Sequence, residues 1–414
     1  MTTSDTAYVW VWLPGASEPV VAGRLRRDGK THTFTYGISY LARPEKFALC
    51  LPELPLQRGP QRPDPTWEAH NCILDAGPDF WGRRVILAKH FGRLDAASDT
   101  DDLDLLTYLL ESGSDRIGAL DFQESATEYV PRTYEHQATV SELMSAADRI
   151  QAGEPLSPAL TEAMLRGTSI GGARPKALID DDDGRKLIAK FSSTTDTYPV
   201  VKAEGIAMRL GASAGLNVAP TQVVQAGNRD VLLVDRFDRV PGGSRKMMVS
   251  ALTIFGLSPM NGRYGTYPAL ADRIRAQFTN PDATLRELFS RIVFNVIVGN
   301  TDDHARNHAA FWDGAAFTLT PAYDLCPQPR SGGEVEQALA IGRDGDRRSR
   351  LQVCENAAEV YHLTRAEARD IIDQQVEVVR SAWDEAADDV GLTIPERNRL
   401  MGGAILNQSI FYED

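Results

Sequence analysis

The sequence contains few cysteines, and they lie far apart. Only four occur among 414 residues, namely Cys50, Cys72, Cys326 and Cys354. None is paired at the short spacing of a zinc ribbon, and so small a number does not indicate a disulfide scaffold. The cysteines therefore favour a protein of a reducing compartment such as the cytoplasm.

The sequence also lacks long apolar runs. No segment approaches the ~20 consecutive apolar residues that a membrane-spanning helix needs. The polar start from Met1 to Tyr8 has neither the basic flank nor the apolar stretch of a signal peptide. We therefore expect a soluble, cytoplasmic protein with no membrane partner.

Positive charge is in deficit as well. Lys and Arg number 44 against 57 Asp and Glu, which gives a formal net charge of −13. A surface that coats nucleic acid is therefore not expected. With 43% hydrophobic and 24% charged residues, the composition is that of a globular protein, and the length suits roughly two to three domains.

The first third of the chain begins with strands and continues with helices. Strand-like runs occupy Tyr8 to Leu13, Val20 to Arg24 and Thr31 to Tyr36. A Pro-rich stretch over 52–65 separates them from helical segments, of which Thr100 to Glu111 is the clearest. These patterns predict a small β-rich module followed by helices.

The middle of the chain alternates strands with one helix. A glycine-rich segment from Thr168 to Ile179 leads through the acidic turn at 180–184 into the strand Lys186 to Phe191, which together predict a hairpin. The segment Val200 to Ala214 predicts a helix that ends near Gly215. Two more strands are predicted at Thr221 to Gln225 and at Val231 to Val234.

The second half of the chain has mainly helical periodicity. Apolar residues from Leu285 to Ile297 follow three-four spacing, which predicts a buried helix. A polar segment and a hairpin over Ala310 to Leu319 come next. Thr364 and Glu367 have the spacing of a capping box that starts a long C-terminal helix.

The order of polar residues in these elements suits phosphoryl transfer. That chemistry needs a cation at the phosphates, a carboxylate that accepts the proton of the attacking hydroxyl, and oxygen ligands for Mg²⁺. Asp302 and Asn307 have the five-residue interval of the catalytic Asp and the metal-binding Asn of protein kinases. Asp324 follows after a hairpin as a second metal-binding carboxylate, while Lys190 and Glu204 can form an ion pair.

Each of these features has a simpler structural explanation when taken alone. Paired aspartates commonly decorate helix ends, and the dipeptide Gly171-Gly172 is a common turn that does not match the Walker pattern. His304 and His308 are four residues apart, as in some zinc sites, but no Glu follows His304 as a zincin motif requires. The combined spacing favours phosphoryl transfer over these alternatives.

Three segments resemble motifs of the HipA-type serine/threonine kinases, the toxins of type II toxin–antitoxin modules. They are Ser169 to Lys176, Gly299 to Asn307 and Tyr323-Asp324, and the strands from Val9 to Tyr36 look like the N-terminal subdomain of that family. The resemblance covers most of the chain. It implies an α+β, two-lobed protein-kinase-like fold with a β-rich N-terminal subdomain and a mainly helical C-terminal lobe.

The resemblance also divides the chain into three parts. Residues 1–115 are expected to form the HipA N-terminal subdomain, which is β-rich and then helical. Residues 116–240 are expected to form the nucleotide-binding N-lobe. Residues 241–414 are expected to form the helical C-lobe, which carries the catalytic and metal-binding loops.

Roles in the site follow from the same resemblance. Asp302 is implied as the catalytic base, Asn307 and Asp324 as ligands of Mg²⁺, and Glu204 as the ion-pair partner of Lys190. The backbone of Asp235 to Phe237 is implied as the hinge that meets the adenine. The full set of implied ATP-binding residues is Gly171, Gly172, Ala173, Arg174, Lys176, Lys190, Asp235, Arg236, Phe237, His304, Arg306, Asn307, Tyr323 and Asp324.

A regulatory serine and two departures from the family pattern lie in these motifs. Ser169 occupies the position whose autophosphorylation ejects the loop in this family, because phosphate adds about two negative charges near the acidic site. Arg174 and Pro175 stand where the family has a polar or acidic pair, and Pro175 removes one backbone donor. Arg306 replaces the more usual lysine before Asn307.

The implied activity is transfer of the ATP γ-phosphate to a serine or threonine of another protein and to Ser169. Known targets in the family include aminoacyl-tRNA synthetases, and the implied partner is a small DNA-binding antitoxin of HipB type, through which alone the chain would meet DNA. A small-molecule phosphotransferase with the same Asp–Asn–Asp set is the first alternative. The second is a catalytically idle antitoxin-binding co-repressor, against which the intact set argues.

Overall fold

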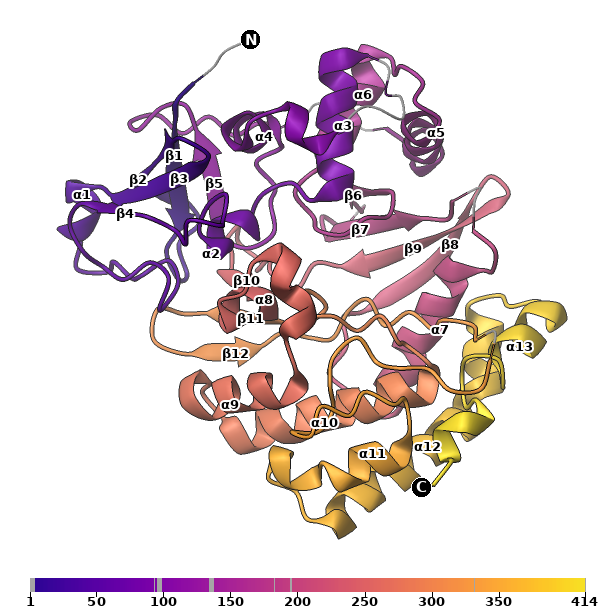
Figure 1. The fold of residues 1–414 in the computed structure, drawn as a ribbon. Coiled ribbons are helices and arrows are strands. Elements are labelled where there is room, and N and C mark those ends of the chain that lie inside the picture. The colour runs from indigo at the N-terminus through magenta and orange to yellow at the C-terminus, as the bar shows by residue number, and fades with distance from the viewer. Residues whose placement is uncertain are drawn as a thin grey trace.

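The computed structural model describes residues 4–92, 94, 99–133, 138–181, 183–193, 196–330 and 332–413. Within these residues the chain forms a five-stranded, a four-stranded and a three-stranded sheet, with helices gathered around them (Figure 1). Residues 1–3 of the polar N-terminus and residue 182 of the predicted acidic turn lie outside the described residues.

The N-terminal sheet is antiparallel and has the strand order β4-β3-β2-β1-β5. Its first three strands confirm the predicted β-rich opening. The fifth strand lies after the expected domain boundary at residue 115, yet it pairs with β1. The strands are β1 (Thr6–Trp12), β2 (Pro19–Asp28), β3 (Thr31–Tyr36), β4 (Pro60–Gln61) and β5 (Leu120–Gln123).

The helix predicted from Thr100 to Glu111 is wrong as a single element. The structure has a 3₁₀ turn, η1 (Thr100–Asp102), and then a separate helix α4 (Leu105–Glu111). Asp104 causes the break, because its carboxylate accepts a hydrogen bond from the backbone N–H of Leu106 and so caps a new helix. Two shorter helices, α1 (Ile38–Leu41) and α2 (Asn71–Leu74), precede it.

The four-stranded sheet is antiparallel, has the order β6-β7-β9-β8 and is covered on both faces. Side chains of α3, α5 and α6 form one hydrophobic cluster with Ala177, Phe191 and Val231 of the sheet. On the other face, α7 lies against the sheet (Figure 1). The backbone of Gly205 in this helix comes close to the side chains of Val223 and Leu232. The elements are β6 (Lys176–Asp180), β7 (Lys186–Phe191), β8 (Thr221–Ala226), β9 (Arg229–Asp235), α3 (Phe80–Phe91), α5 (Val140–Gln151), α6 (Pro158–Leu165) and α7 (Val200–Ser213).

The C-terminal lobe is built around α10 (Pro281–Val298), as its apolar spacing predicts. The helix ends at Gly299, whose φ of 72° is left-handed and therefore suits glycine. The predicted hairpin and the capping box of Thr364 and Glu367 are also confirmed. The remaining elements are β10 (Met248–Ser250), β11 (Ala309–Trp312), β12 (Phe317–Leu319), α8 (Ala251–Phe255), η2 (Pro259–Tyr264), α9 (Tyr267–Gln277), α11 (Leu351–Asn356), η3 (Ala358–Tyr361), α12 (Arg365–Asp389), α13 (Ile394–Leu400) and η4 (Gln408–Phe411).

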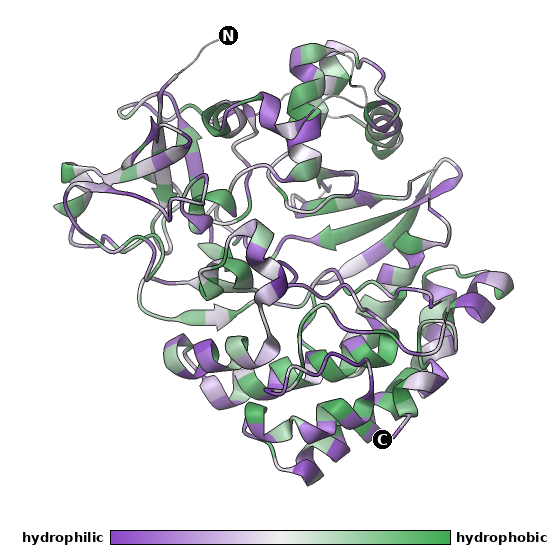
Figure 2. Cartoon of the chain, in the orientation of Figure 1, coloured by the Kyte–Doolittle hydropathy of each residue, from purple (hydrophilic) through white to green (hydrophobic). Residues whose placement is uncertain are grey.

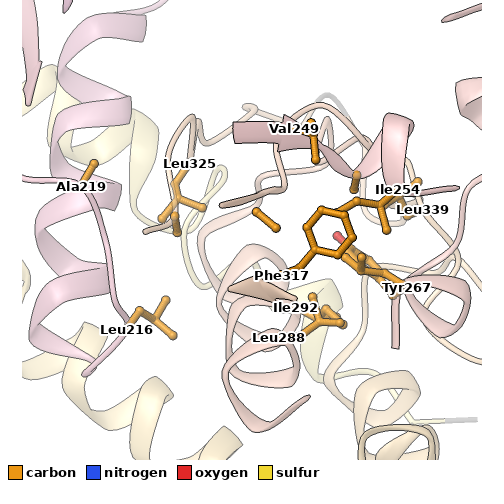
Figure 3. Close-up of a cluster of buried hydrophobic side chains, with 14 of the residues drawn as sticks. Leu216, Ala219, Val249, Ile254, Tyr267, Leu288, Ile292, Phe317, Leu325 and Leu339 are labelled. Carbon is orange, nitrogen blue, oxygen red and sulfur yellow. The ribbon is translucent and has the colours of Figure 1, made fainter. Parts of the chain in front are cut away.

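The main hydrophobic core extends from the N-terminal sheet into the C-terminal lobe. Figure 2 shows that α10 is largely hydrophobic, whereas α12 alternates hydrophobic and hydrophilic residues. In Figure 3, Leu288 and Ile292 of α10 face Phe317 and Tyr267. No helix among the described residues has the length and apolarity that crossing a membrane requires.

Truncation of the core at α10 should destabilise the C-terminal lobe. Leu288 is fully buried, so Leu288→Ala removes packed methyl groups and leaves a cavity, at a cost of about 2–5 kcal/mol in the free energy of unfolding. Denaturant unfolding followed by circular dichroism measures this. The control Arg286→Ala, on the exposed side of the same helix, should change stability by less than about 0.5 kcal/mol. Equal effects would contradict the assigned core.

Candidate active site

A cleft of about 2030 Å³ lies where the three sheets approach one another. It is bordered by the N-terminal subdomain, by strands β6, β7 and β9, and by the two loops at 300–307 and 323–328. Asp302, Glu204 and every residue expected from the sequence to bind nucleotide line this cleft. Ser169 is the one predicted site residue that does not.

Lys190 lies between two carboxylates at the centre of the cleft. Its Nζ is 2.5 Å from Oε1 of Glu204 on α7 and 2.7 Å from Oδ1 of Asp324. Burial by itself would favour a neutral lysine, but the two carboxylates outweigh it and hold the pKa of Lys190 above its ordinary value. The same attraction lowers the pKa of Asp324 to about 2, so the predicted ion pair is present and Asp324 joins it.

Asp324 has an unusual backbone conformation. Its φ of 61° lies in the left-handed region, which non-glycine residues rarely adopt. The preceding Tyr323 anchors the loop, because its hydroxyl donates a 2.7 Å hydrogen bond to the backbone oxygen of Arg306. Such strained residues cluster at functional sites, where the surrounding structure holds them in place. The loop therefore presents the Asp324 carboxylate to the cleft.

The loop after α10 presents Asp302 and Asn307 to the same cleft. The Asn307 side-chain amide donates a 3.2 Å hydrogen bond to the backbone oxygen of Asp302, which leaves its own side-chain oxygen available as a ligand. The Asp302 side chain is exposed. Partial desolvation raises the pKa of Asp302. The nearby His304 acts to lower this pKa, and the nearby Asp324 acts to raise it. Asp302 thus has the position of a proton acceptor.

Asp303 faces the opposite way and is buried. Its Oδ2 accepts hydrogen bonds from the Tyr267 hydroxyl at 2.5 Å and from the Asn295 amide at 2.7 Å, and lies 2.7 Å from Nε2 of His308. These contacts fix the loop that carries Asp302. His304 is exposed in the cleft while His308 is buried, so the structure does not bring the two histidines together as a zinc pair.

The glycine-rich loop folds over Lys176. Gly171 and Gly172 have φ values of 75° and 101°, and a Cβ at Gly172 would lie only 2.4 Å from the Lys176 Nζ. That amine also contacts the backbone oxygen of Gly171 and lies 3.7 Å from Oδ2 of Asp79. Burial lowers the pKa of Lys176, which Asp79 opposes. Both positions favour glycine because their positive φ values are ones that other residues rarely adopt.

Other charged side chains of the predicted set are engaged elsewhere. The side chain of Arg236 is fully buried and forms ion pairs with Asp115 at 2.9 Å and with Asp238 at 2.8 Å. It therefore points away from the cleft, and only the backbone of Arg236 can act as a hinge. Arg174 forms an ion pair with Asp196. Arg306 remains exposed at the cleft.

Ser169 packs against the segment of residues 116–117 that follows α4. It is 2% exposed, and its Oγ accepts a 3.2 Å hydrogen bond from Arg116. Its backbone oxygen accepts a second bond, from the N–H of Ile117. Arg116 is itself fully buried and pairs with Asp121 at 2.7 Å. The serine hydroxyl must therefore leave this position before it can react.

Two residues beside the site were missed by sequence reasoning. Asp79 caps α3 by accepting a hydrogen bond from the Gly82 N–H, and it also faces Lys176. The capping role of Asp79 can be recognised from the neighbouring sequence. Its contact with Lys176 cannot, because the two residues are far apart in the chain. Arg116 carried no signal either, because its contacts with Ser169 arise only when two distant segments pack together.

Two family models match the chain. The HipA-like C-terminal domain matches residues 168–383, and the HipA N-terminal domain matches residues 11–123. The first range includes the glycine-rich loop, Lys190, Asp302 and Asp324. The match therefore covers the segments that line the candidate site.

Curated relatives and one solved structure agree with these matches. The serine/threonine-protein kinase toxin HipA of Shewanella oneidensis is 30% identical over 206 residues, which are 43% of this chain and 47% of the relative. The toxin YjjJ of Escherichia coli is 27% identical over 188 residues, 42% of this chain and 41% of the relative. The chain thus spans less than half the length of these relatives.

The solved structure of the Shewanella oneidensis MR-1 toxin–antitoxin system, HipA with HipB and operator DNA, shares the fold. Its TM-score is 0.68 at 20% identity, and the superposition covers 99% of this chain and 100% of that chain. At this identity the likeness concerns the fold. The expected α+β, two-lobed protein-kinase-like fold is confirmed.

Loss of the Lys190 cation should destabilise the protein. Lys190→Met leaves the buried Glu204 without its counter-ion, at a cost of about 3 kcal/mol in the free energy of unfolding. The control is Lys186→Met on the same strand. Its ion-pair partner Asp180 is exposed, so this change should lower the free energy of unfolding by less than about 1 kcal/mol. Thermal and denaturant unfolding compare the two variants. An equal loss of stability in both variants would show that the Lys190–Glu204 pair contributes no more to folding than an exposed ion pair.

Proposed function

This chain belongs to the HipA family of serine/threonine kinase toxins, and from that premise we propose that it is an ATP-dependent protein kinase. The observation that carries the proposal is the convergence of Asp302, Asn307 and Asp324 with Lys190 in one cleft. These are the side chains that phosphoryl transfer requires, and they come from three separate segments. The proposed reaction is transfer of the ATP γ-phosphate to a serine or threonine hydroxyl.

The residues of the cleft fit Mg²⁺ and ATP. Asn307 and Asp324 offer oxygen atoms, the ligands that Mg²⁺ prefers, and one Asp324 oxygen is already oriented by Lys190. When bound, Mg²⁺ neutralises charge on the phosphates. Lys190 would contact the α- and β-phosphates, while Glu204 positions its ammonium group. The loop from Gly171 to Lys176 would lie against the nucleotide, and Asp235 to Phe237 would meet the adenine.

Asp302 is proposed as the catalytic base. Its carboxylate is exposed in the cleft, and the neighbouring Asp303 network fixes the loop beneath it. It would accept the proton of the attacking hydroxyl. His304 and Arg306 are exposed on the same loop, and the Arg306 guanidinium would add positive charge near the transferred group. The raised pKa of Asp302 makes it a better proton acceptor than an ordinary carboxylate.

Partners and targets are proposed from the family. The relative of known structure is described as a complex of HipA with HipB and operator DNA, which supports a HipB-type antitoxin as partner and DNA contact through it alone. A cellular protein is the proposed substrate, with aminoacyl-tRNA synthetases as the first class to test. We place this activity in the cytoplasm.

We also propose the three-part division of the chain. Residues 1–115 would form the N-terminal subdomain, 116–240 the nucleotide-binding N-lobe and 241–414 the C-lobe. In this division β5 is a strand that the second part contributes to the N-terminal sheet. The segment around residue 116 would then connect the subdomain with the kinase lobes.

Removal of the proposed base should abolish transfer but keep nucleotide binding. Asp302→Asn keeps the shape of the side chain and removes its basicity, so the rate of phosphate transfer should fall by about 10²–10⁴-fold. Radiolabel transfer and fluorescent-nucleotide binding measure the two effects. Asp384→Asn, an exposed aspartate on α12, is the control and should leave both unchanged. Full activity in Asp302→Asn would disprove its assignment as base.

Ser169 should become phosphorylated in the wild type. Its site is buried against Arg116 and has no room for a phosphate group, so phosphorylation would expel the loop and switch the kinase off. Peptide mass spectrometry after incubation with Mg²⁺ and ATP tests this, with Asp302→Asn as the inactive control. Ser169→Ala should stay active during the same incubation.

Two other outcomes would redirect the proposal. Loss of activity of Ser169→Ala on incubation with ATP would show that Ser169 is not the switch. ATP binding without phosphate on any protein would favour a small-molecule phosphotransferase or an idle antitoxin-binding co-repressor. Assay of the free chain with small hydroxyl compounds separates these two, because the co-repressor should turn over no ATP.

A further inference from the structure

Two of the four cysteines meet in the N-terminal subdomain, although they are 22 positions apart in the sequence. Cys50 lies in the segment after α1, and Cys72 lies in α2. The carboxylate of Glu53 lies beside them, and one possible ligand atom from each of the three residues lies within 4.8 Å of the others. No other such group of His, Cys, Asp or Glu occurs among the described residues.

The cluster is buried and incompletely satisfied. Cys50 is 1% and Cys72 is 0% exposed. Oε2 of Glu53 accepts a 3.0 Å hydrogen bond from the backbone N–H of Cys72, but Oε1 is buried and has no hydrogen-bond partner. A buried carboxylate oxygen without a partner costs free energy. A cation between the three side chains would satisfy it.

The donor atoms suit Zn²⁺. Zn²⁺ binds cysteine sulfur and carboxylate oxygen in tetrahedral geometry, with Zn–S distances of about 2.3 Å. Ligand atoms in such a site are separated by roughly 3.6–3.8 Å, so side-chain shifts of about 1 Å close the cluster around an ion. Glu53 is only partly buried, which gives an ion a path from solvent.

We propose that Cys50, Glu53 and Cys72 bind one Zn²⁺ ion. Both thiols lose a proton to solvent, as does any Glu53 carboxyl that is protonated, two S–Zn bonds and one O–Zn bond form, and no electron is transferred. The Cys72 N–H that holds Glu53 orients the carboxylate toward the ion. None of the three residues lines the cleft, so this site is separate from the proposed Mg²⁺ site.

The ion would stabilise the contact between α2 and the kinase lobes. Asp75 directly follows α2, and its carboxylate accepts hydrogen bonds from the Ser250 N–H and hydroxyl and from the Thr253 hydroxyl. The Cys50 segment and α2 would be joined by bonds to the metal rather than by packing alone. With three protein ligands, a water molecule would complete the tetrahedron. The proposed site joins two segments of the subdomain, and it does not depend on the proposed kinase activity.

Metal titration of the whole chain tests the proposal. The protein is reduced, stripped of metal with a chelator and titrated with Co²⁺ and then Zn²⁺ in excess Mg²⁺, which occupies the oxygen ligands of the cleft. We expect one equivalent of Co²⁺ to give a thiolate-to-cobalt charge-transfer band that Zn²⁺ abolishes. Cys50→Ser and Cys72→Ser should lose this band, and Glu53→Gln should bind Zn²⁺ at least about tenfold more weakly.

Cys354→Ser is the matched control, because Cys354 is also fully buried but lies apart from the cluster. It should keep the band unchanged. Absence of the band in the wild type, or its persistence in Cys50→Ser and Cys72→Ser, overturns the proposal. If those variants do not fold, alkylation of the wild type decides: one equivalent of Zn²⁺ should slow labelling of Cys50 and Cys72 relative to Cys354, and equal labelling overturns the site.

Discussion

The arrangement of the cleft depends on the ammonium group of Lys190. It bridges Glu204 on α7 and Asp324 on the loop after β12, so it joins the four-stranded sheet to the C-terminal lobe. Without this cation the two carboxylates would face each other in a partly dry site and repel. The strained φ of Asp324 is tolerated in this setting. The Lys190 charge thus links three elements, namely β7, α7 and the loop after β12.

Local patterns were sufficient to predict much of the fold. The hairpin after the glycine-rich loop, the buried helix α10 and the capping box at Thr364 all have signals within a few residues. The interval between Asp302 and Asn307 likewise placed both in the cleft. The prediction of one helix over 100–111 was wrong, because Asp104 caps a new helix within the apolar pattern.

Pairings between distant segments could not be predicted. The sequence gives no reason for Cys50 to meet Cys72, or for Arg116 to reach Ser169, since these contacts exist only after packing. The adjacent aspartates of the loop after α10 show the same limit. Asp302 and Asp303 are chemically identical, and the buried partners of Asp303 alone determine which of the two faces the cleft.

Two adjacent residues at the junction of the N-terminal subdomain and the N-lobe make contacts on either side of that junction. Asp115 pairs with Arg236 at the proposed hinge, while Arg116 donates a hydrogen bond to Ser169 at the start of the glycine-rich loop. These two contacts are not equivalent. Arg116 also pairs with Asp121 at 2.7 Å, so it keeps an ion-pair partner when the serine leaves. The contact of Asp115 with Arg236 does not involve the glycine-rich loop. Release of Ser169 would therefore free the loop while the subdomain keeps its hold on the hinge, which makes the proposed switch a local one.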